Sequence, residues 1–302
     1  MSTPALSTAK NRPPAARDVL ELLKPITWFP PMWAFMCGCI SSGESLAERW
    51  PFVIVGILLT GPLVCGNSQA INDWFDRHVD AINQPERPIP SGRIAGQWGL
   101  WIAIGGTLLS LAVSLIAGYW VFAATCLGIA CAWAYSAPPL RLKMSGIWGP
   151  GVVGLTYEGL TWFTGAAVMA GTLPRAEILI VLLLYSLGAH GIMTLNDFKA
   201  VEGDRKMGVR SLPAMLGVDR AAQIACVVMA LPQALVVLLL VNWGHGLAAL
   251  IVGALVVAQL ALMPRLLSNP LKYTPWYNAT GTSLYVFGML AAAFGLGGAV
   301  GL

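Results

Sequence analysis

Long runs of apolar residues, separated by short polar segments, occupy most of this chain. A transmembrane helix needs about 20 consecutive, mainly apolar residues to cross the hydrocarbon core of a bilayer. Runs bounded by charges, Pro or Gly predict nine such spans: 26–42, 51–72, 96–116, 118–136, 147–170, 176–196, 220–242, 246–266 and 280–301. Because these spans use nearly all of the 302 residues, the pattern predicts an all-α, polytopic membrane protein with no separate soluble domain.

The first 17 residues differ from the rest of the chain. They read MSTPALSTAKNRPPAAR, a small, polar and Pro-rich stretch that lacks the apolar core of a signal peptide. The stretch 1–17 is therefore predicted to be a short disordered cytoplasmic tail. Residues 18–302 are predicted to form a single transmembrane domain.

Positive charge is distributed unevenly between the two sides of the predicted bundle. Lys and Arg near span ends stay on the cytoplasmic side of a membrane. Alternate loops, beginning with the N-terminus, hold 16 of the 18 Lys and Arg residues, and the opposite loops hold only Arg49 and Arg175. This bias predicts a cytoplasmic N-terminus and accounts for most of the net charge of +4. No basic module interleaved with aromatic residues occurs, so no nucleic-acid partner is expected.

Two acidic segments interrupt the apolar pattern on the predicted cytoplasmic side. The first, 72-NDWFDRHVD-80, and the second, 196-NDFKAVEGD-204, share the opening Asn-Asp and the closing Asp at the same spacing. At ~100° per helical residue, the Asn and Asp residues of each segment lie within about 100° of one another. Each set is therefore predicted to share one helix face, from which Glu202 points away.

The likeness between the two segments continues downstream. Asp80 is followed by 87-RPIP-90 and Asp204 by 210-RSLP-213. Four predicted spans separate the segments, so both emerge on the same side of the membrane. We interpret 72–90 and 196–213 as pseudo-repeats of an internal duplication. The alternative, that acidic residues merely solvate helix ends, explains one segment more readily than two matched ones.

The chemistry of these side chains predicts a site for a metal ion and a diphosphate. Carboxylates that converge at a membrane interface repel one another and need a cation. Mg²⁺ suits Asp and Asn oxygens and is typically held by one or two carboxylates together with substrate phosphates. The candidate metal ligands are Asn72, Asp76, Asp80, Asp197 and Asp204, of which Asp76, Asp80 and Asp204 are the candidate catalytic residues. The candidate diphosphate-binding bases are Arg77, Lys199, Arg205 and Arg210, with Arg141 and Lys143 from the loop 135-YSAPPLRLK-143.

The spacing Asn72-x-x-x-Asp76-x-x-x-Asp80 and the segment 196–204 resemble the two Asp-rich motifs of the UbiA superfamily, the intramembrane prenyltransferases. The resemblance implies nine helices around a central cavity that opens towards the bilayer, with an Mg²⁺-dependent diphosphate site under cytosolic loops. The segments 24–43, 72–94, 135–143 and 196–213 look most like the chlorophyll synthase group and, within it, the bacteriochlorophyll synthases. The likeness runs from about residue 20 to the C-terminus.

One position departs from the family pattern. Many members carry a second motif of the form Asp-x-x-x-Asp that ends where Asp204 stands, whereas this chain has Ala200 at the first Asp position. Asp197 is predicted to lie on the same helix face as Asp204. The hypothesis is that these two residues supply the second metal-facing pair.

The resemblance implies a specific reaction. A geranylgeranyl or phytyl group would pass from its diphosphate to the propionate carboxylate of bacteriochlorophyllide, which completes bacteriochlorophyll synthesis. Mg²⁺ and the bases would stabilise the leaving diphosphate, and the carboxylate would capture an allylic carbocation in a cavity that excludes water. The expected location is a bacterial inner membrane, cytoplasmic or intracytoplasmic, with the site facing the cytoplasm. Association with other photosynthetic membrane or pigment-pathway proteins is compatible with this function.

Three further polar residues have both a functional and a structural interpretation. Tyr135 could hydrogen-bond the diphosphate or belong to the interfacial aromatic belt. Glu158, near the middle of the fifth predicted span, and His190, six residues before Asn196, are candidate residues of the acceptor pocket. Glu158 and His190 could instead join two helices through a hydrogen bond.

The pattern leaves other functions open. The nearest is an intramembrane prenyltransferase that acts on another acceptor, such as an aromatic ring, haem or a lipid alcohol. A transporter with repeated halves would place polar residues along a path through the membrane, whereas the aspartates here gather at one face. A non-catalytic pigment carrier would bind bacteriochlorophyllide without turnover.

Overall fold

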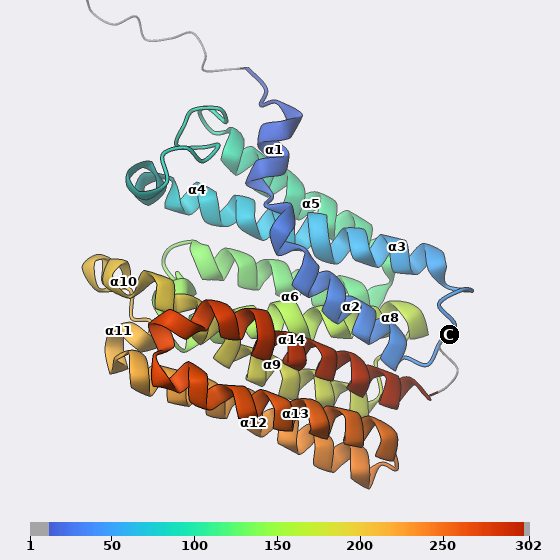
Figure 1. The fold of residues 1–302 in the computed structure, drawn as a ribbon. Coiled ribbons are helices and arrows are strands. Elements are labelled where there is room, and N and C mark those ends of the chain that lie inside the picture. The colour runs from blue at the N-terminus through green and yellow to red at the C-terminus, as the bar shows by residue number, and fades with distance from the viewer. Residues whose placement is uncertain (1–11, 299–302) are drawn as a thin grey trace, which may run out of the picture.

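The computed structural model describes residues 12–298, and this part of the chain is built from helices (Figure 1). The α-helices are α1 (Ala16–Leu22), α2 (Phe29–Ser41), α3 (Trp50–Leu58), α4 (Gly66–Asn83), α5 (Trp98–Ala117), α6 (Tyr119–Ser136), α7 (Trp148–Gly154), α8 (Thr161–Ala170), α9 (Ala176–Asn196), α10 (Val201–Met207), α11 (Leu212–Leu216), α12 (Val218–Asn242), α13 (Gly246–Ser268) and α14 (Pro270–Gly297). A single isolated bridge, between Ser145 and Arg210, is the β-type pairing found among the described residues. The all-α fold class expected from the sequence is confirmed.

Helix α1 begins at Ala16, inside the stretch 1–17 that the sequence predicted to be a tail; residues 1–11 of that stretch lie outside the described part of the chain. Arg93, in the loop after α4, holds α1 in place: its guanidinium donates to Asp18 at 2.8 Å and to Glu21 at 2.6 Å. This pairing raises the pKa of Arg93 and lowers the pKa of Glu21. Leu22 of the same helix is buried in a small apolar core with Ile71 and Ile94.

Seven helical segments of the described residues are long and apolar enough to cross a membrane: Trp50–Asn83, Trp98–Ala117, Tyr119–Ser136, Ala176–Met207, Val218–Asn242, Gly246–Ser268 and Pro270–Gly297. The chain is a multi-pass membrane protein. Two of the nine predicted spans are not among these seven. The span 26–42 becomes α2, whose 13 residues are fewer than a bilayer crossing needs. The span 147–170 becomes α7, a π-helical segment and α8, with polar residues at its centre. The total of nine and the cytoplasmic N-terminus stay predictions.

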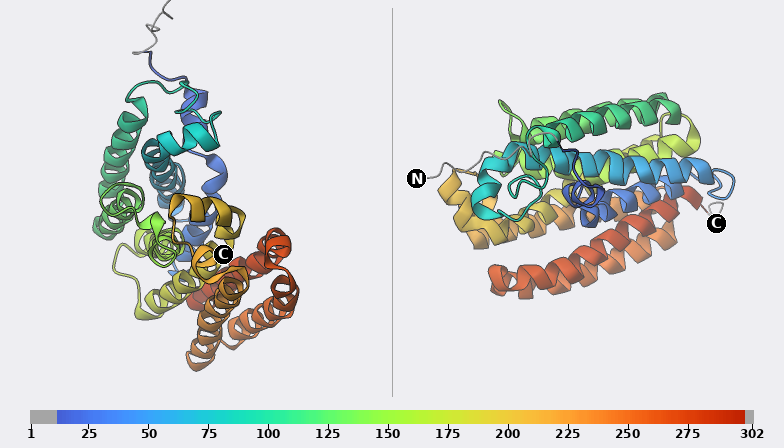
Figure 2. Two further views of the ribbon diagram at one scale, coloured as in Figure 1. Left: turned by 90° about the vertical axis from the view of Figure 1, so that its left-hand side faces the viewer. Right: turned by 90° about the horizontal axis from the view of Figure 1, so that it is seen from above.

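The long helices lie alongside one another, and the short helices α10 and α11 lie at one end of the bundle (Figure 1). Figure 1 shows α10 and α11 at this end, together with the loop that follows α4, while α14 ends at the opposite end. Figure 2 shows the same arrangement from above. Both acidic segments therefore lie at one end of the molecule, as the sequence predicted.

Close backbone contact joins α2 to α8 in the middle of the fold. A Cβ atom on Gly38 would overlap the Trp162 carbonyl oxygen, and one on Gly165 would overlap the Phe35 carbonyl oxygen. Glycine lets helices approach in this way inside membranes. Beside the contact, the Trp162 ring stacks on Tyr185 of α9 with 5.8 Å between centroids. This packing holds α8, at the end of the segment 147–170, against α2 and α9.

Candidate active site

The first acidic segment lies on α4, where Asp76 meets two bases. Its Oδ1 atom accepts a hydrogen bond from Lys143 Nζ at 2.5 Å and lies 3.5 Å from a guanidinium nitrogen of Arg141. Both bases belong to the loop between α6 and α7. Arg141 has a left-handed backbone, with φ 39°, which residues other than Gly seldom adopt and which often occurs at functional sites. The loop is thus shaped to carry both positive charges to Asp76.

Lys143 is poorly solvated, with 13% of its side chain exposed. Burial lowers its pKa, and the hydrogen bond from its ammonium group to Asp76 acts in the opposite direction. The contact with Asp76 therefore supports the charged form of Lys143 in an environment that disfavours it.

The other two aspartates of α4 have different partners. Arg87 donates to Asp80 Oδ2 at 2.7 Å and also lies 3.3 Å from Asp73 Oδ1. Lys24 donates to the same Asp73 oxygen at 2.6 Å. Asp73 and Asp80 are both buried. Because Arg87 is the arginine of 87-RPIP-90, the first pseudo-repeat folds back onto its own helix.

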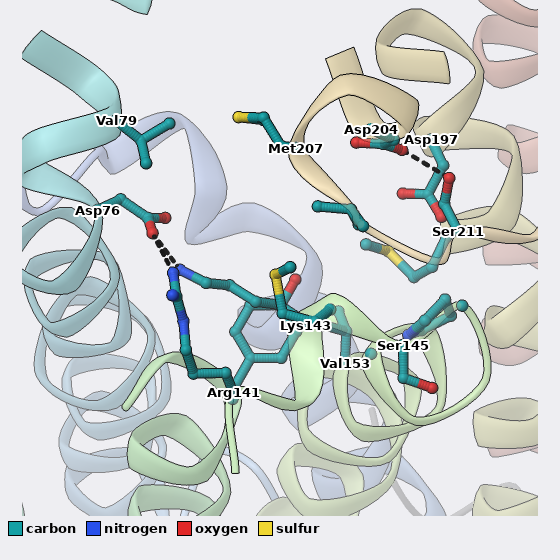
Figure 3. Close-up of a pocket in the computed structure, with 17 residues that line it drawn as sticks. Asp76, Val79, Arg141, Lys143, Ser145, Val153, Asp197, Asp204, Met207 and Ser211 are labelled. Atoms are coloured by element: carbon teal, nitrogen blue, oxygen red, sulfur yellow. Dashed lines mark hydrogen bonds and ion pairs between the residues drawn. The ribbon is translucent and has the colours of Figure 1, made fainter. Parts of the chain in front are cut away.

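The second acidic segment is not one continuous α-helix, and the prediction of an ideal helix face was wrong in this detail. Helix α9 ends at Asn196, a 3-10 turn covers Asp197–Ala200, and α10 begins at Val201. A 3-10 turn rotates successive residues further than an α-helix does and is common at helix ends. Asp197 and Asp204 nevertheless lie on the same side of the site (Figure 3).

In each pseudo-repeat, a residue of the loop after the helix returns to hydrogen-bond the last Asp of the acidic segment, but the two donors differ in charge. Ser211 Oγ donates to Asp204 Oδ2 at 2.6 Å, seven residues along the chain, just as Arg87 lies seven residues beyond Asp80. The first repeat therefore places a cation on its carboxylate, whereas the second places a neutral hydroxyl group there. More negative charge is left uncompensated in the second repeat.

Backbone hydrogen bonds attach the base-carrying loop to the second repeat. Gly146 N donates to Arg210 O at 2.7 Å, and Arg210 N donates to Met144 O at 2.9 Å. Lys143, one residue before Met144, is consequently held between the two acidic segments.

Two connected cavities adjoin these residues. The first has a volume of about 480 Å³ and is lined by Asp76 on one side and by Asp197 and Asp204 on the other, with Lys143 and Arg141 reaching Asp76 (Figure 3). The second has a volume of about 580 Å³ and a mostly apolar wall. Four residues line both cavities, namely Tyr135, Val153, Met193 and Asp197. The two cavities therefore adjoin at these residues.

The structure brings most of the predicted site residues to these cavities. Those lining the first are Asp76, Tyr135, Arg141, Lys143, Asp197 and Asp204. Those lining the second are Asn72, Tyr135, Glu158, Asp197 and Lys199. The predicted residues that line neither are Asp80, Arg77, Arg205, Arg210 and His190.

The residues away from the cavities have other contacts. The Arg77 guanidinium lies 4.1 Å from the centre of the Trp74 ring. Arg205 Nε points to a backbone carbonyl at 3.4 Å. His190 Nε2 lies 3.1 Å from the Ile147 carbonyl oxygen, which places this ring at the contact between α7 and α9.

Sequence reasoning missed three residues that take part in the site. Ser211 could have been found by counting seven residues from Asp204, the separation of Arg87 from Asp80. Gln69, which lines the second cavity, lies seven residues before Asp76 and so on the same helix face. Arg87 was noted only as part of a repeated motif, since nothing in the sequence shows that it turns back towards α4.

The fit of a metal ion can be judged from the carboxylates. Within residues 12–298, no three Asp, Glu, His or Cys side chains form a preassembled metal cage. Mg²⁺, however, is usually held by one or two carboxylates, waters and substrate phosphates. Asp76 on one side of the first cavity and Asp197 and Asp204 on the other are ligands of the type that Mg²⁺ takes when a bound diphosphate completes its coordination.

Residues 27–276 match the model of the UbiA prenyltransferase family. The chain belongs to the UbiA prenyltransferase family. It is 59% identical to the bacteriochlorophyll synthase 33 kDa chain of Cereibacter sphaeroides over 97% of each chain. The solved structure of a digeranylgeranylglyceryl phosphate synthase matches 92% of this UbiA chain and 98% of its own, with TM-score 0.74 and 21% identity. A UbiA homologue from Archaeoglobus fulgidus bound to GPP and Mg²⁺ matches 93% and 99%, with TM-score 0.65 and 19% identity.

These matches confirm three of the sequence predictions. The resemblance to the UbiA superfamily is borne out by the family match, and the chain is a prenyltransferase. The helical architecture is also that of solved UbiA structures.

Proposed function

We propose that this UbiA prenyltransferase transfers a geranylgeranyl or phytyl group from its diphosphate to the propionate carboxylate of bacteriochlorophyllide. The observation that carries the proposal is the arrangement of Asp76, Asp197 and Asp204 with two bases around a cavity that adjoins a second, mostly apolar one. The acceptor assignment is supported by the 59% identity with the bacteriochlorophyll synthase chain of C. sphaeroides.

The metal-binding role falls to the carboxylates that face the first cavity. Asp76, Asp197 and Asp204 would hold Mg²⁺ together with the diphosphate of the donor. When bound, Mg²⁺ would neutralise the charge that develops on the leaving diphosphate. The A. fulgidus homologue bound to GPP and Mg²⁺ supports this choice of metal. Asn72 stays a predicted ligand, and so does Asp80, which accepts a hydrogen bond from Arg87 and lines neither cavity.

The bases have two successive roles. Before substrate binds, Lys143 and Arg141 neutralise Asp76, which otherwise would be a poorly solvated charge. A diphosphate in the first cavity offers these bases further oxygen atoms, and charge-assisted hydrogen bonds to phosphate are among the stronger polar interactions in proteins. Lys143 and Arg141 therefore orient the diphosphate and hold it after the bond to the isoprenoid has broken.

The transfer requires one bond to break and one to form. The bond between C1 of the isoprenoid and a diphosphate oxygen breaks, and its electron pair leaves with the diphosphate. A propionate oxygen of the acceptor then forms the new bond to C1. This carboxylate is already ionised at neutral pH, so no general base is needed. The apolar wall of the second cavity keeps water from the intermediate allylic cation.

The proposal includes a location. An excess of Lys and Arg on the loops at the end that holds the acidic segments supports a site that faces the cytoplasm. The membrane would be a bacterial inner membrane, cytoplasmic or intracytoplasmic, where bacteriochlorophyllide meets lipid-soluble isoprenoid donors. Other proteins of the same pigment pathway would be the neighbours with which it associates.

A turnover assay tests the proposed function. Protein in detergent is incubated with geranylgeranyl diphosphate and bacteriochlorophyllide, with and without Mg²⁺, and the pigment is separated by chromatography. Esterified pigment should form only with Mg²⁺ and should be absent in Asp76→Asn. The matched control is Glu202→Gln, an exposed carboxylate on α10 outside both cavities, which should keep wild-type activity. Diphosphate release without ester would contradict the acceptor assignment, and neither product from a folded sample would contradict the whole proposal.

A further inference from the structure

Two π-helical segments, Leu59–Cys65 and Leu155–Leu160, border the second cavity. The first contains Pro62, which cannot donate a backbone hydrogen bond and so disturbs the α-helical pattern. The second contains no proline and carries Glu158. Short π-helical segments are frequent at functional sites because they redirect the side chains of a helix. Glu158 is therefore placed on this wall by an unusual local structure.

Some polar groups of this wall satisfy one another. Gln69 Nε2 donates to the Tyr157 hydroxyl oxygen at 3.1 Å. Cys65 Sγ lies 3.4 Å from the same hydroxyl. These three residues, from α4 and the two π-helical segments, form a small network within the protein.

Two other polar groups of the wall lack such partners. The carboxyl group of Glu158 forms no hydrogen bond or ion pair with another of the residues that the structure describes, although it lines the cavity. Thr282 of α14 also lines the cavity, and its Oγ1 atom is buried without a partner in residues 12–298. Polar groups in an apolar wall are nearly always hydrogen-bonded, so the half-buried Glu158 carboxyl group, which lines the cavity without a partner from another described residue, indicates a ligand that supplies the missing atoms. The buried Thr282 hydroxyl is a second unpaired group of the same wall.

The two substrates differ in their ability to supply these atoms. Beyond its diphosphate, an isoprenoid donor is a hydrocarbon and has no hydrogen-bonding atom. The ring of a chlorin-type acceptor carries carbonyl oxygens in addition to the propionate that reacts. The acceptor ring, unlike the isoprenoid chain, can therefore supply a hydrogen-bonding partner for Glu158.

We propose that Glu158 donates a hydrogen bond to a carbonyl oxygen on the acceptor ring, that Thr282 provides a second contact, and that this pair selects the acceptor. The inference rests on the proposed function and names the recognition element of that site. A neutral carboxyl group suits the role for two reasons. No cation pairs with Glu158 among the described residues, and a carboxylate ion in this cavity would compete with the acceptor for the allylic cation.

The test compares Glu158→Leu, Glu158→Gln and Thr282→Val in the full-length protein. In Glu158→Leu, the KM for bacteriochlorophyllide should rise about tenfold or more, because one good hydrogen bond is lost, while the KM for geranylgeranyl diphosphate stays unchanged. Glu158→Gln keeps an N–H donor and should retain most of the acceptor affinity. Thr282→Val should raise the acceptor KM by a smaller factor.

A spectroscopic readout separates recognition from a structural role. A ring carbonyl of the acceptor, followed by resonance Raman spectroscopy, should vibrate at lower frequency when bound to the wild type than when free. The shift should shrink in Glu158→Gln and disappear in Glu158→Leu. No shift in the wild type would overturn the inference without any variant, so it stays testable even where Glu158→Leu does not fold.

Two further kinetic results would also overturn the inference about Glu158 and Thr282. Equal rises in both KM values would indicate a structural role for Glu158, and a fall in kcat alone would indicate an interaction with the allylic cation. Failure of the proposed function has a different signature, since the wild type would then form no ester. An active wild type with unchanged acceptor KM in all three variants would reject only the role of Glu158 and Thr282.

Discussion

Lys143 Nζ lies 2.5 Å from Asp76 Oδ1, a contact that joins the loop before α7 to helix α4. Since backbone hydrogen bonds attach the same loop to Arg210, this contact connects the two acidic segments through a single short loop. The site thus has its positive charge in place before a diphosphate arrives.

We expect Lys143→Gln to lower kcat/KM for the isoprenoid diphosphate by about 10- to 100-fold, because a hydrogen bond to a charged group contributes about 1.5 to 3 kcal/mol. Lys143→Arg should lose less, since it keeps the charge. Steady-state kinetics with varied diphosphate measures the effect. Lys206→Gln, an exposed base on α10 outside both cavities, is the control. Equal activity of the Lys143→Gln and Lys206→Gln variants would show that Lys143 does not bind the diphosphate.

Ser211→Ala should weaken Mg²⁺ binding. The hydroxyl orients Asp204 through a 2.6 Å hydrogen bond, and loss of a group that positions a metal ligand typically costs about 10- to 100-fold in metal affinity. The measurement is the Mg²⁺ concentration that gives half-maximal turnover. Ser211→Thr, which keeps the hydroxyl, should stay close to the wild type. An unchanged Mg²⁺ requirement in Ser211→Ala would remove Asp204 from the metal site or Ser211 from its support.

Arg87→Leu should destabilise the protein. It leaves Asp80 without its ion-pair partner and Asp73 with Lys24 alone, and breaking a buried pair typically costs about 3 kcal/mol. Thermal unfolding in detergent should show a transition several degrees lower. Arg77→Leu removes an arginine that stacks on Trp74 and should cost about 1 kcal/mol or less.

A second variant distinguishes charge from packing at Arg87. Asp80→Asn combined with Arg87→Leu should recover part of the lost stability, because the uncompensated carboxylate is then gone. If the double variant is no more stable than Arg87→Leu alone, the ion pair to Asp80 is not the source of the loss.

Gly38→Ala should destabilise the contact between α2 and α8. The added methyl group would overlap the Trp162 carbonyl oxygen, and overpacking of this kind costs about 1 to 3 kcal/mol. Gly105→Ala is the matched control, because no atom lies within 4 Å of a Cβ placed at this helical glycine. Gly105→Ala should be neutral or stabilising by up to about 1 kcal/mol. Thermal unfolding compares the two, and equal transition temperatures would contradict the close contact.

Much of the fold follows from local sequence properties. Apolar runs predicted where the long helices lie, because a bilayer crossing demands length and hydropathy that the sequence states directly. The same patterns did not show that 26–42 divides into a 3-10 turn and α2, or that 147–170 contains a π-helical segment, since local hydropathy does not reveal where a helix begins, stops or changes form. The start of α2 at Phe29, after the 3-10 turn Pro25–Thr27, and the π-helical segment around Glu158 depend on neighbouring helices.

The candidate site was likewise predictable from the sequence only in part. Helical periodicity placed Asp76 and Asp80 on one face of α4 but did not distinguish them. In the tertiary structure, Asp80 accepts a hydrogen bond from Arg87. Asp76 instead accepts one from Lys143 and lines the first cavity. These partners lie 7 and 67 residues away along the chain, and only the folded loops bring them within hydrogen-bonding distance.

The sequence by itself determined the class of this protein, its membrane-spanning helices and the kinds of side chain at its site, because hydropathy, periodicity and motif spacing are local properties. The tertiary structure decided which carboxylates line a cavity, which bases they contact and which polar groups in the wall of the second cavity lack a partner. Those outcomes depend on contacts between segments far apart in the chain, whose distances no local pattern contains.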